Sequence, residues 1–356
     1  MPQDSGRPVG VRMAAHATTR ESSVTAPTHT RTAPFIAADV GGTHVRMSLV
    51  AVDGEGATPQ VLAYSKFRCS DYASLADIVR EFIASLGRHP VSVAVIASAG
   101  YPLADGTVIT NNLPWPLSPR ELREDLGLQA VHVINDFEAV ANAVGHLGSS
   151  EVLQLSGPAQ AAPGPLLVLG PGTGLGAAVW IPRGKGGVVL ATEAGQAALA
   201  VGTELEMRLL QHMLGERSHV PIEHALSGPG LLHLYQALCA LRGTAPVHAQ
   251  PGDITTAAID GADPLAREAL EMFCGLLGST VGDMALLYGV QGVYLAGGIL
   301  PQIRGFLASS SFRARFLNKG SMREALERVS VKLVEHGQLG VIGAASWYLG
   351  SGLLEQ

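Results

Sequence analysis

Hydrophobic and polar positions follow two spacings along this chain, one typical of strands and one typical of helices. Three apolar stretches within residues 35–67, FIAADVGG, HVRMSLVAV and QVLAYSKF, predict three strands, with a glycine turn between the first two. Residues 72–87 then carry apolar side chains at helical spacing and end on Gly87, a residue favoured at helix C-termini. The ordered part of the chain is therefore expected to begin as three strands and a helix.

The same pattern predicts strand, helix, strand and helix in the stretch that follows. VSVAVIASAG has the composition of a strand buried on both faces. SPRELREDLG opens with Ser118, Pro119 and Glu121, a capping box with proline at the first helical position. AVHVIND and FEAVANAV predict the next strand and helix, with the polar residues Asn135 and Asp136 at their junction.

The second half of the chain starts in the same way. PLLVLGPGTG, LGAAVWIP and KGGVVLATEAG predict strand, glycine turn, strand and strand. A long helix is expected after Asp263, which can cap it, with Pro264 at its first position. GVYLAGGILPQI predicts a strand that breaks at two glycines and continues as a helix. Two similarly ordered halves indicate an internal structural repeat.

Composition limits the classes of protein to consider. With 356 residues and 47% hydrophobic residues, the chain is long enough for two domains with full cores. A net charge of −6, without a run of lysine or arginine, argues against nucleic acid as a partner. No apolar stretch reaches the roughly 18 uninterrupted residues of a membrane helix. Three scattered cysteines without a Cys-x-x-Cys pair fit a reducing cytoplasm and predict neither a zinc site nor a disulfide framework.

Residues 1–34 differ from the rest. They are rich in Thr, Ser, Ala, Pro and His, show no periodicity and contain no apolar core of a secretory signal. Their arginine-rich, acid-poor character has a weak similarity to a transit peptide, but an unstructured start, with Met13 as an alternative initiator, is the favoured interpretation. We therefore expect a disordered N-terminal tail.

Two glycine turns carry the candidate chemistry. The second contains glycines at every other position from 170 to 176, which fits neither the dinucleotide fingerprint nor a Walker loop, and it joins two strands rather than a strand and a helix. A Gly-Gly-Thr or Gly-Thr-Gly hairpin can turn several backbone N–H groups toward a phosphate. Two such hairpins, at 41–43 and 172–174, can hold a triphosphate from both sides, and Asp39 can hold Mg²⁺ directly or through water.

Six motifs, in this order, resemble those of the bacterial glucokinase family, the proteobacterial type within the hexokinase and actin-like ATPase superfamily. They are DVGGTHVRMSLV, INDFEAVA, GPGTGLGAA, EAG, LSGPGL and LAGG, and the resemblance covers nearly everything from residue 35 onward. It implies a two-domain α/β fold of the actin-like, ribonuclease-H-like type with the active site in the interdomain cleft. The expected domains are a small one at 35–146, completed by a C-terminal helix at 336–356, and a larger one at 147–335.

The resemblance also implies ATP-dependent phosphorylation of glucose, with ATP and Mg²⁺ as cofactors, in a cytoplasmic homodimer. Asp136 would be the general base for the 6-hydroxyl of the sugar. The sugar contacts implied by the resemblance are Asn111, Asn135, Asp136, Glu193, Gln196 and Glu223. The nucleotide contacts so implied are Asp39, Gly41, Gly42, Thr43, Gly172, Thr173, Gly174, Gly297 and Gly298.

One position departs from the family pattern. The family usually reads Glu-Gly-Gly-His where this chain has Glu193, Ala194, Gly195 and Gln196, so a sugar-contacting histidine is replaced by glutamine. Two alternatives stay open: a kinase for another hexose such as mannose, fructose or an amino sugar, and a sugar-binding regulator with little catalysis. An intact Asp136 argues against the regulator, because a pure sensor gains little from a catalytic base. Neither the cysteine-rich zinc motif of the related repressors nor a helix-turn-helix is recognisable in the sequence.

Overall fold

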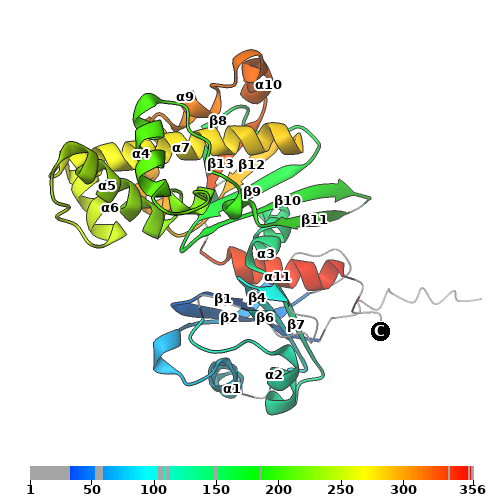
Figure 1. The fold of residues 1–356 in the computed structure, drawn as a ribbon. Helices are drawn as coiled ribbons and strands as arrows, with labels where there is room; N and C mark the ends of the chain where they lie inside the picture. The colour runs from blue at the N-terminus through cyan, green and yellow to red at the C-terminus, as the bar shows by residue number, and fades with distance from the viewer. Residues whose placement is uncertain are drawn as a thin grey trace, which may run out of the picture.

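The structure, a computed structural model, describes residues 33–52, 59–87, 89–102, 108–109, 113–147, 151–184, 186–335, 337–351 and 353. Within these residues, two large sheets are stacked along the long direction of the molecule, and two helices lie between them (Figure 1). The predicted N-terminal tail lies outside the described residues up to residue 32, and Asn111 lies outside them as well.

The first sheet has five strands in the order β3-β2-β1-β4-β7. Strand β1 pairs antiparallel with β2 and parallel with β4, while β2 pairs antiparallel with β3 and β4 parallel with β7. The strands are β1 (Phe35–Val40), β2 (His44–Ala51), β3 (Gln60–Arg68), β4 (Val93–Ser98) and β7 (Ala130–Asn135). A separate two-stranded sheet contains β5 (Tyr101–Pro102) and β6 (Val108–Ile109).

Helices cover both faces of this sheet, because its central strands are apolar on both sides. Ile36 and Ala38 of β1 are buried in the core that includes α1 (Leu75–Ser85) and α2 (Pro119–Leu126). Phe35 and Ala37, which alternate with them and face the opposite side of the sheet, are buried against α11 (Leu339–Gly350). The predicted order of three strands, helix, strand, helix, strand and helix is confirmed, and Ser118 caps α2 by accepting from the N–H of Glu121.

The second sheet repeats the first, with one strand added. Its order is β11-β10-β9-β12-β13-β8, so its first three strands are again antiparallel neighbours and its next two are parallel to β9. The strands are β8 (Val152–Ser156), β9 (Leu166–Pro171), β10 (Leu175–Arg183), β11 (Gly186–Thr192), β12 (Gly292–Leu295) and β13 (Ser330–Val334). The internal repeat predicted from the two glycine turns is confirmed at the level of topology.

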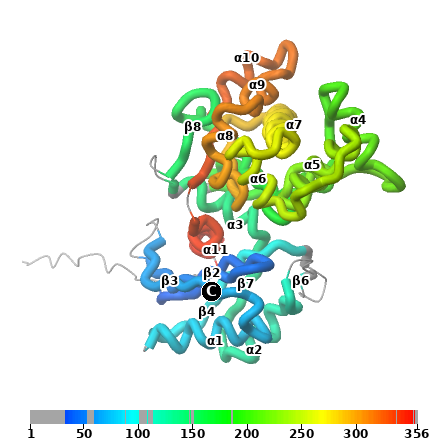
Figure 2. The backbone as a smooth tube through the Cα atoms, turned by 90° about the vertical axis from the view of Figure 1, so that its left-hand side faces the viewer, coloured from blue at the N-terminus to red at the C-terminus, as the bar shows by residue number. Residues whose placement is uncertain are grey.

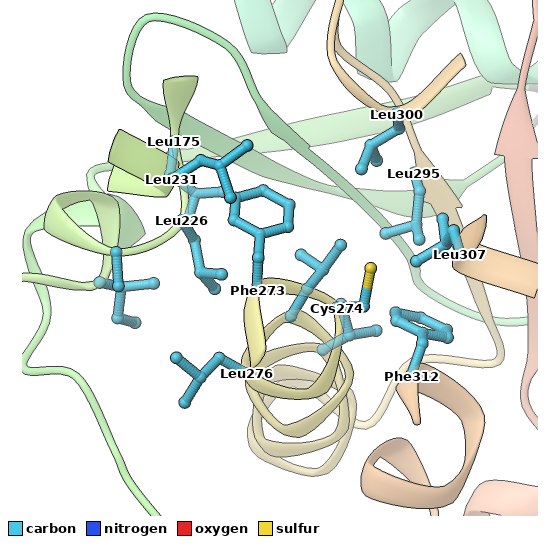
Figure 3. Close-up of a cluster of buried hydrophobic side chains, with 14 of the residues drawn as sticks. Leu175, Leu226, Leu231, Phe273, Cys274, Leu276, Leu295, Leu300, Leu307 and Phe312 are labelled. Atoms are coloured by element: carbon cyan, nitrogen blue, oxygen red, sulfur yellow. The ribbon is translucent and has the colours of Figure 1, made fainter. Parts of the chain in front are cut away.

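The core of the second sheet is built around one long helix, α7 (Pro264–Tyr288), which Asp263 caps as predicted. The side chains of Phe273 and Cys274 on α7 lie in a cluster with buried leucines and with Phe312, which come from other elements (Figure 3). Although α7 is long and apolar enough to cross a membrane, 67% of its most apolar window is buried inside the protein. The other helices here are α4 (Glu204–Leu214), α5 (Gly228–Arg242), α6 (Pro251–Asp260), α8 (Arg304–Ser309), α9 (Phe312–Phe316) and α10 (Arg323–Glu327).

Helix α3 (Asp136–Ala143) connects the two halves. It follows β7 of the first sheet directly, yet it packs against β9, β10 and β11 of the second sheet and against α11. Both views place α3 and α11 between the two sheets (Figures 1 and 2). The β7–α3 junction, where the sequence places Asn135 and Asp136, therefore lies where the two halves of the molecule meet.

Candidate active site

A cleft of about 520 Å³ opens at this meeting place, and both halves of the chain line it. Eight of the predicted site residues lie in its wall: Asn135, Asp136, Gly172, Thr173, Gly174, Glu193, Gln196 and Glu223. A concave site of this size with a few converging polar groups is typical of small-molecule binding. The structure thus brings the predicted sugar residues and the second glycine hairpin into one cavity.

The two polar residues at the β7–α3 junction have different roles in the structure. Asn135 is the N-cap of α3, and its Oδ1 accepts from the N–H groups of Phe137 at 2.9 Å and Glu138 at 3.1 Å. Because Asn135 satisfies the helix end, Asp136 is the first residue of the helix rather than its cap. Its Oδ1 accepts one bond from the N–H of Phe137, at 2.9 Å. The carboxylate of Asp136 is thereby available to the cleft.

Burial is the main influence on the charge of Asp136. It raises the pKa of this carboxyl to about 6, the negative charges of Asp39 and Glu193 add to the rise, and the N–H of Phe137 acts against it. A carboxyl group with a pKa near 6 is largely ionised at pH 7 and is a stronger base than an ordinary aspartate. Perturbed carboxyl groups of this kind are typical of catalytic positions.

Glu223, a predicted sugar contact, is hydrogen-bonded to a residue of the glycine hairpin and to a second predicted contact. Its Oε2 accepts from the N–H of Leu175, directly after the hairpin turn, at 3.3 Å. Its Oε1 accepts from Nε2 of Gln196 at 2.8 Å. The glutamine that replaces the family's histidine therefore has a protein partner, which the sequence did not reveal.

Two backbone hydrogen bonds and a close packing contact also hold the second hairpin. The N–H of Gly172 donates to the carbonyl of Gly174 across the turn at 2.8 Å, and the carbonyl of Gly172 accepts from the N–H of Gly228 at the start of α5, also at 2.8 Å. Gly297 has a φ of +103°, a conformation that favours glycine, and a β-carbon there would lie 2.5 Å from the carbonyl oxygen of Pro171. Gly297 and the adjoining Gly298 thus lie beside the second hairpin, as the predicted nucleotide site requires.

The first hairpin, residues 41–43, joins β1 to β2 and lies outside the lining of the cavity. Asp39 precedes it and forms an ion pair with Arg46, its cross-strand neighbour, at 3.1 Å. Burial raises the pKa of Asp39, and the charge and hydrogen bond of Arg46 oppose that rise. Cys69 is hydrogen-bonded to both ends of the turn. Its thiol donates to the carbonyl of Gly41 at 3.2 Å, and its N–H donates to the carbonyl of Thr43 at 2.9 Å.

The sequence reasoning missed Arg46, Cys69 and Phe137. A signal for Arg46 was present, since it is a charged residue within a mostly apolar strand, close in sequence to Asp39. Cys69 carried no signal, because an isolated cysteine has many roles. Among the described residues, no group of three or more His, Cys, Asp or Glu side chains is arranged to hold a metal ion.

Comparisons with known proteins identify the family to which the chain is similar. The sequence profile of the family described as Glucokinase matches residues 36–350. A glucokinase-like protein of Xylella fastidiosa is 58% identical over 329 residues, covering 91% of this chain and 98% of that protein. A glucokinase of Paramagnetospirillum magneticum is 39% identical over 316 residues, which cover 87% of this chain and 96% of that protein.

A solved structure extends the likeness to the fold. The crystal structure of a glucokinase from an Antarctic psychrotroph aligns with a TM-score of 0.77 and 35% identity, covering 88% of this chain and 98% of that one. The two-sheet α/β architecture expected from the sequence motifs, that of the actin-like ATPases, is therefore the fold of this chain.

Proposed function

Because the chain belongs to the glucokinase family, we propose that it transfers the γ-phosphoryl group of ATP to the 6-hydroxyl of glucose. The observation that carries this proposal is the cleft itself, which holds the half-buried carboxylate of Asp136, a glycine hairpin and the side chains Glu193, Gln196 and Glu223 together. Relatives that are 35% to 39% identical carry the name glucokinase. The products are glucose-6-phosphate and ADP.

Asp136 is the general base of the proposed reaction. The nucleophile is a neutral alcohol, so its attack on phosphorus is favoured when a positioned carboxylate accepts its proton. A pKa of about 6 suits this task at neutral pH, because the group is ionised but still basic. Such a base contributes on the order of 10² to 10⁴ in rate. In-line alignment and neutralisation of phosphate charge supply much of the rest.

Hydroxyl recognition falls to the polar side chains at the other end of the cleft. Carboxylates accept two hydroxyl hydrogen bonds each, which discriminates against analogues that lack a hydroxyl group. We assign this role to Glu193 and Glu223, with Asn135 and Gln196 as further partners, since all four line the cavity. Asn111 stays a prediction from the family motif, because it lies outside the described residues.

The residues around the first hairpin fit a nucleotide with Mg²⁺. The negative charge of Asp39 contributes to the raised pKa of Asp136, and a divalent cation near them would relieve that repulsion. Mg²⁺ typically binds through one or two carboxylates plus substrate phosphates rather than in an all-protein cage. Asp39 would hold the ion, and when bound it would neutralise charge on the phosphates. The hairpins at 41–43 and 172–174 and the turn at 297–298 would hold the nucleotide.

The assembly and cell compartment that we propose follow the family: a homodimer in the cytoplasm. We divide the chain into a small domain at 35–146 with the C-terminal helix, and a large domain at 147–335. Packing of α11 on β1 and β4 supports its assignment to the first sheet. Packing of α3 on the second sheet indicates that this helix lies at the boundary.

A coupled assay of glucose-6-phosphate formation with the purified protein tests the proposal. We expect ADP to form only when both ATP with Mg²⁺ and glucose are present, because sugar binding completes the site and excludes water. Mannose, fructose and glucosamine compared by kcat/KM decide between glucose and another hexose. Absence of sugar-dependent ADP at millimolar concentrations of every hexose would contradict a kinase and favour a sugar-binding regulator.

A further inference from the structure

The ring of Phe137 occupies space that two glycines, which have no side chain, leave free on β9 and β10 near the second hairpin. Gly170 on β9 and Gly176 on β10 are directly paired across the ladder, one pair further from the turn than Pro171 and Leu175. A β-carbon on Gly176 would overlap the Phe137 ring at Cδ2 and Cε2, and one on Gly170 would lie 3.0 Å from its Cζ. The two glycines therefore form a socket in the sheet surface that this ring fills.

The same residue holds the polar groups of the β7–α3 junction through its main chain. The N–H of Phe137 lies 2.9 Å from Oδ1 of Asn135 and 2.9 Å from Oδ1 of Asp136. One residue is thus hydrogen-bonded to the proposed general base and packed by its ring against the phosphate hairpin. Phe137 also lines the cleft between them.

This double attachment matters because the base and the hairpin come from different halves of the chain. Asp136 follows β7 of the first sheet, whereas the hairpin belongs to the second. Beyond the first turn of α3, Ala141 and Ala143 are buried in the cluster that includes Val168 of β9 and Ala178 of β10. The ring therefore fixes the first turn of α3 to the second sheet, and Asp136 with it.

We propose that Phe137 is a positioning residue that keeps the Asp136 carboxylate at a fixed place relative to the second phosphate hairpin. This role rests on the proposed function, since it presumes that Asp136 accepts a proton while the hairpin holds the transferred phosphate. Transfer needs the reacting groups aligned, and a displacement of about 1 Å can lower the rate by about 10²-fold. Removal of the ring should therefore affect kcat more than binding.

The test is a double-mutant cycle between the ring and its socket. Phe137→Ala should lower kcat by about 10²-fold and Phe137→Leu by about tenfold, with KM for glucose and ATP changed by no more than about threefold. Gly176→Ala should also lower kcat, because the three atoms nearest to a new β-carbon all belong to the Phe137 ring. In the Phe137→Ala background, Gly176→Ala should have little further effect, because the methyl group then enters vacated space.

Phe306→Leu is the matched control, because Phe306 is a partly buried phenylalanine on α8 that does not line the cleft. It should keep the wild-type kcat, and thermal unfolding of every variant separates misplacement from unfolding. An active wild type whose kcat survives Phe137→Leu would overturn this role alone, as would additive effects of Phe137→Ala and Gly176→Ala. A wild type without sugar-dependent ADP formation would overturn the proposed function, and this role with it.

Discussion

The two glycine hairpins are equivalent in the internal repeat, but the protein holds them in different ways. The first hairpin, at 41–43, is held by residues of its own sheet and the turn that follows it. Cys69, directly after β3, donates to the carbonyl groups of Gly41 and Thr43, and Asp39 on β1 pairs with Arg46 on β2. Its surroundings are a thiol and an ion pair. None of these contacts involves Glu193, Gln196 or Glu223.

The second hairpin, at 172–174, is fixed from three other elements. Glu223 accepts from the N–H of Leu175, the start of α5 donates to Gly172, and the ring of Phe137 fills the gap at its base. Glu223 belongs to the proposed sugar site, and Phe137 is hydrogen-bonded through its N–H to the proposed base, Asp136. The repeat has therefore diverged in its supports: those of the second hairpin include a residue of the proposed sugar site and the neighbour of the proposed base, whereas those of the first are Cys69 and the Asp39–Arg46 pair.

Asp136 is the proposed general base, so Asp136→Asn should give the largest effect. We expect kcat to fall by about 10²-fold or more, with glucose affinity changed far less, because asparagine keeps the shape and loses the base. In the wild type, kcat/KM should decline below about pH 6 as Asp136 becomes protonated, and the variant should lack this limb. Rate measurements between pH 5 and 8 on both proteins check the expectation.

The stability of the same variant provides its control. Burial raises the pKa of Asp136 above its unfolded value, so its protonated form favours folding at acid pH, and this contribution is lost as pH rises through about 6. Asp136→Asn should therefore unfold at a higher temperature than the wild type at pH 7. A lower melting temperature together with lost activity would point to misfolding rather than to a missing base.

Glu223→Gln tests the claim that the second hairpin is coupled to the sugar. The charged acceptor of two hydrogen bonds becomes neutral, and a bond to a charged group is worth about 1.5–3 kcal/mol. We expect KM for glucose to rise by tenfold or more and KM for ATP to rise by a smaller factor. Initial rates measured over both substrates decide this, and an unchanged KM for ATP would separate the hairpin from the sugar site.

Cys69→Val is the corresponding test of the first hairpin. Valine removes the donor to the Gly41 carbonyl, a neutral bond worth about 0.5–1.5 kcal/mol, so KM for ATP should rise by about twofold to tenfold. KM for glucose should stay the same. Cys69→Ser keeps a donor and serves as the control. Equal effects of valine on both substrates would show that the two hairpins are not separate in function.

The smallest effects are expected at Gln196. Gln196→Ala leaves Oε1 of Glu223 without its amide donor and should raise KM for glucose by about twofold to tenfold, at the lower end where the carboxylate recruits water. Gln196→His restores the family's residue and should lower KM for glucose with kcat little changed. Glucose KM values for both variants are the measurement. No change in either would mean that Gln196 contributes to neither Glu223 nor the sugar.

Much of the fold was predictable because its signals are local. All strands of the first sheet, four of the second, the caps at Ser118 and Asp263 and the glycine turns follow from apolar spacing and from residues with strong backbone preferences. Strands β8 and β13 of the second sheet were not predicted. The ordered motifs also placed Asn135 and Asp136 at a strand–helix junction, where the structure has them. The sequence did not reveal the protein contacts of two site residues, since Asn135 also caps α3 and Gln196 donates to Glu223.

The sequence by itself determined which residue types were available, in what order, and therefore two half-repeats that each begin with a glycine hairpin. Only the tertiary structure decided which groups meet: Cys69 and Gly41 are 28 residues apart, and Gln196 and Glu223 are 27 apart. Local preferences act over one helical turn or one β-turn, whereas a hydrogen bond or a ring contact depends on distances of a few ångströms set by the packing of whole sheets. The socket of Phe137 is of this second kind, because a glycine is recognised as a site for a ring only when α3 lies against it.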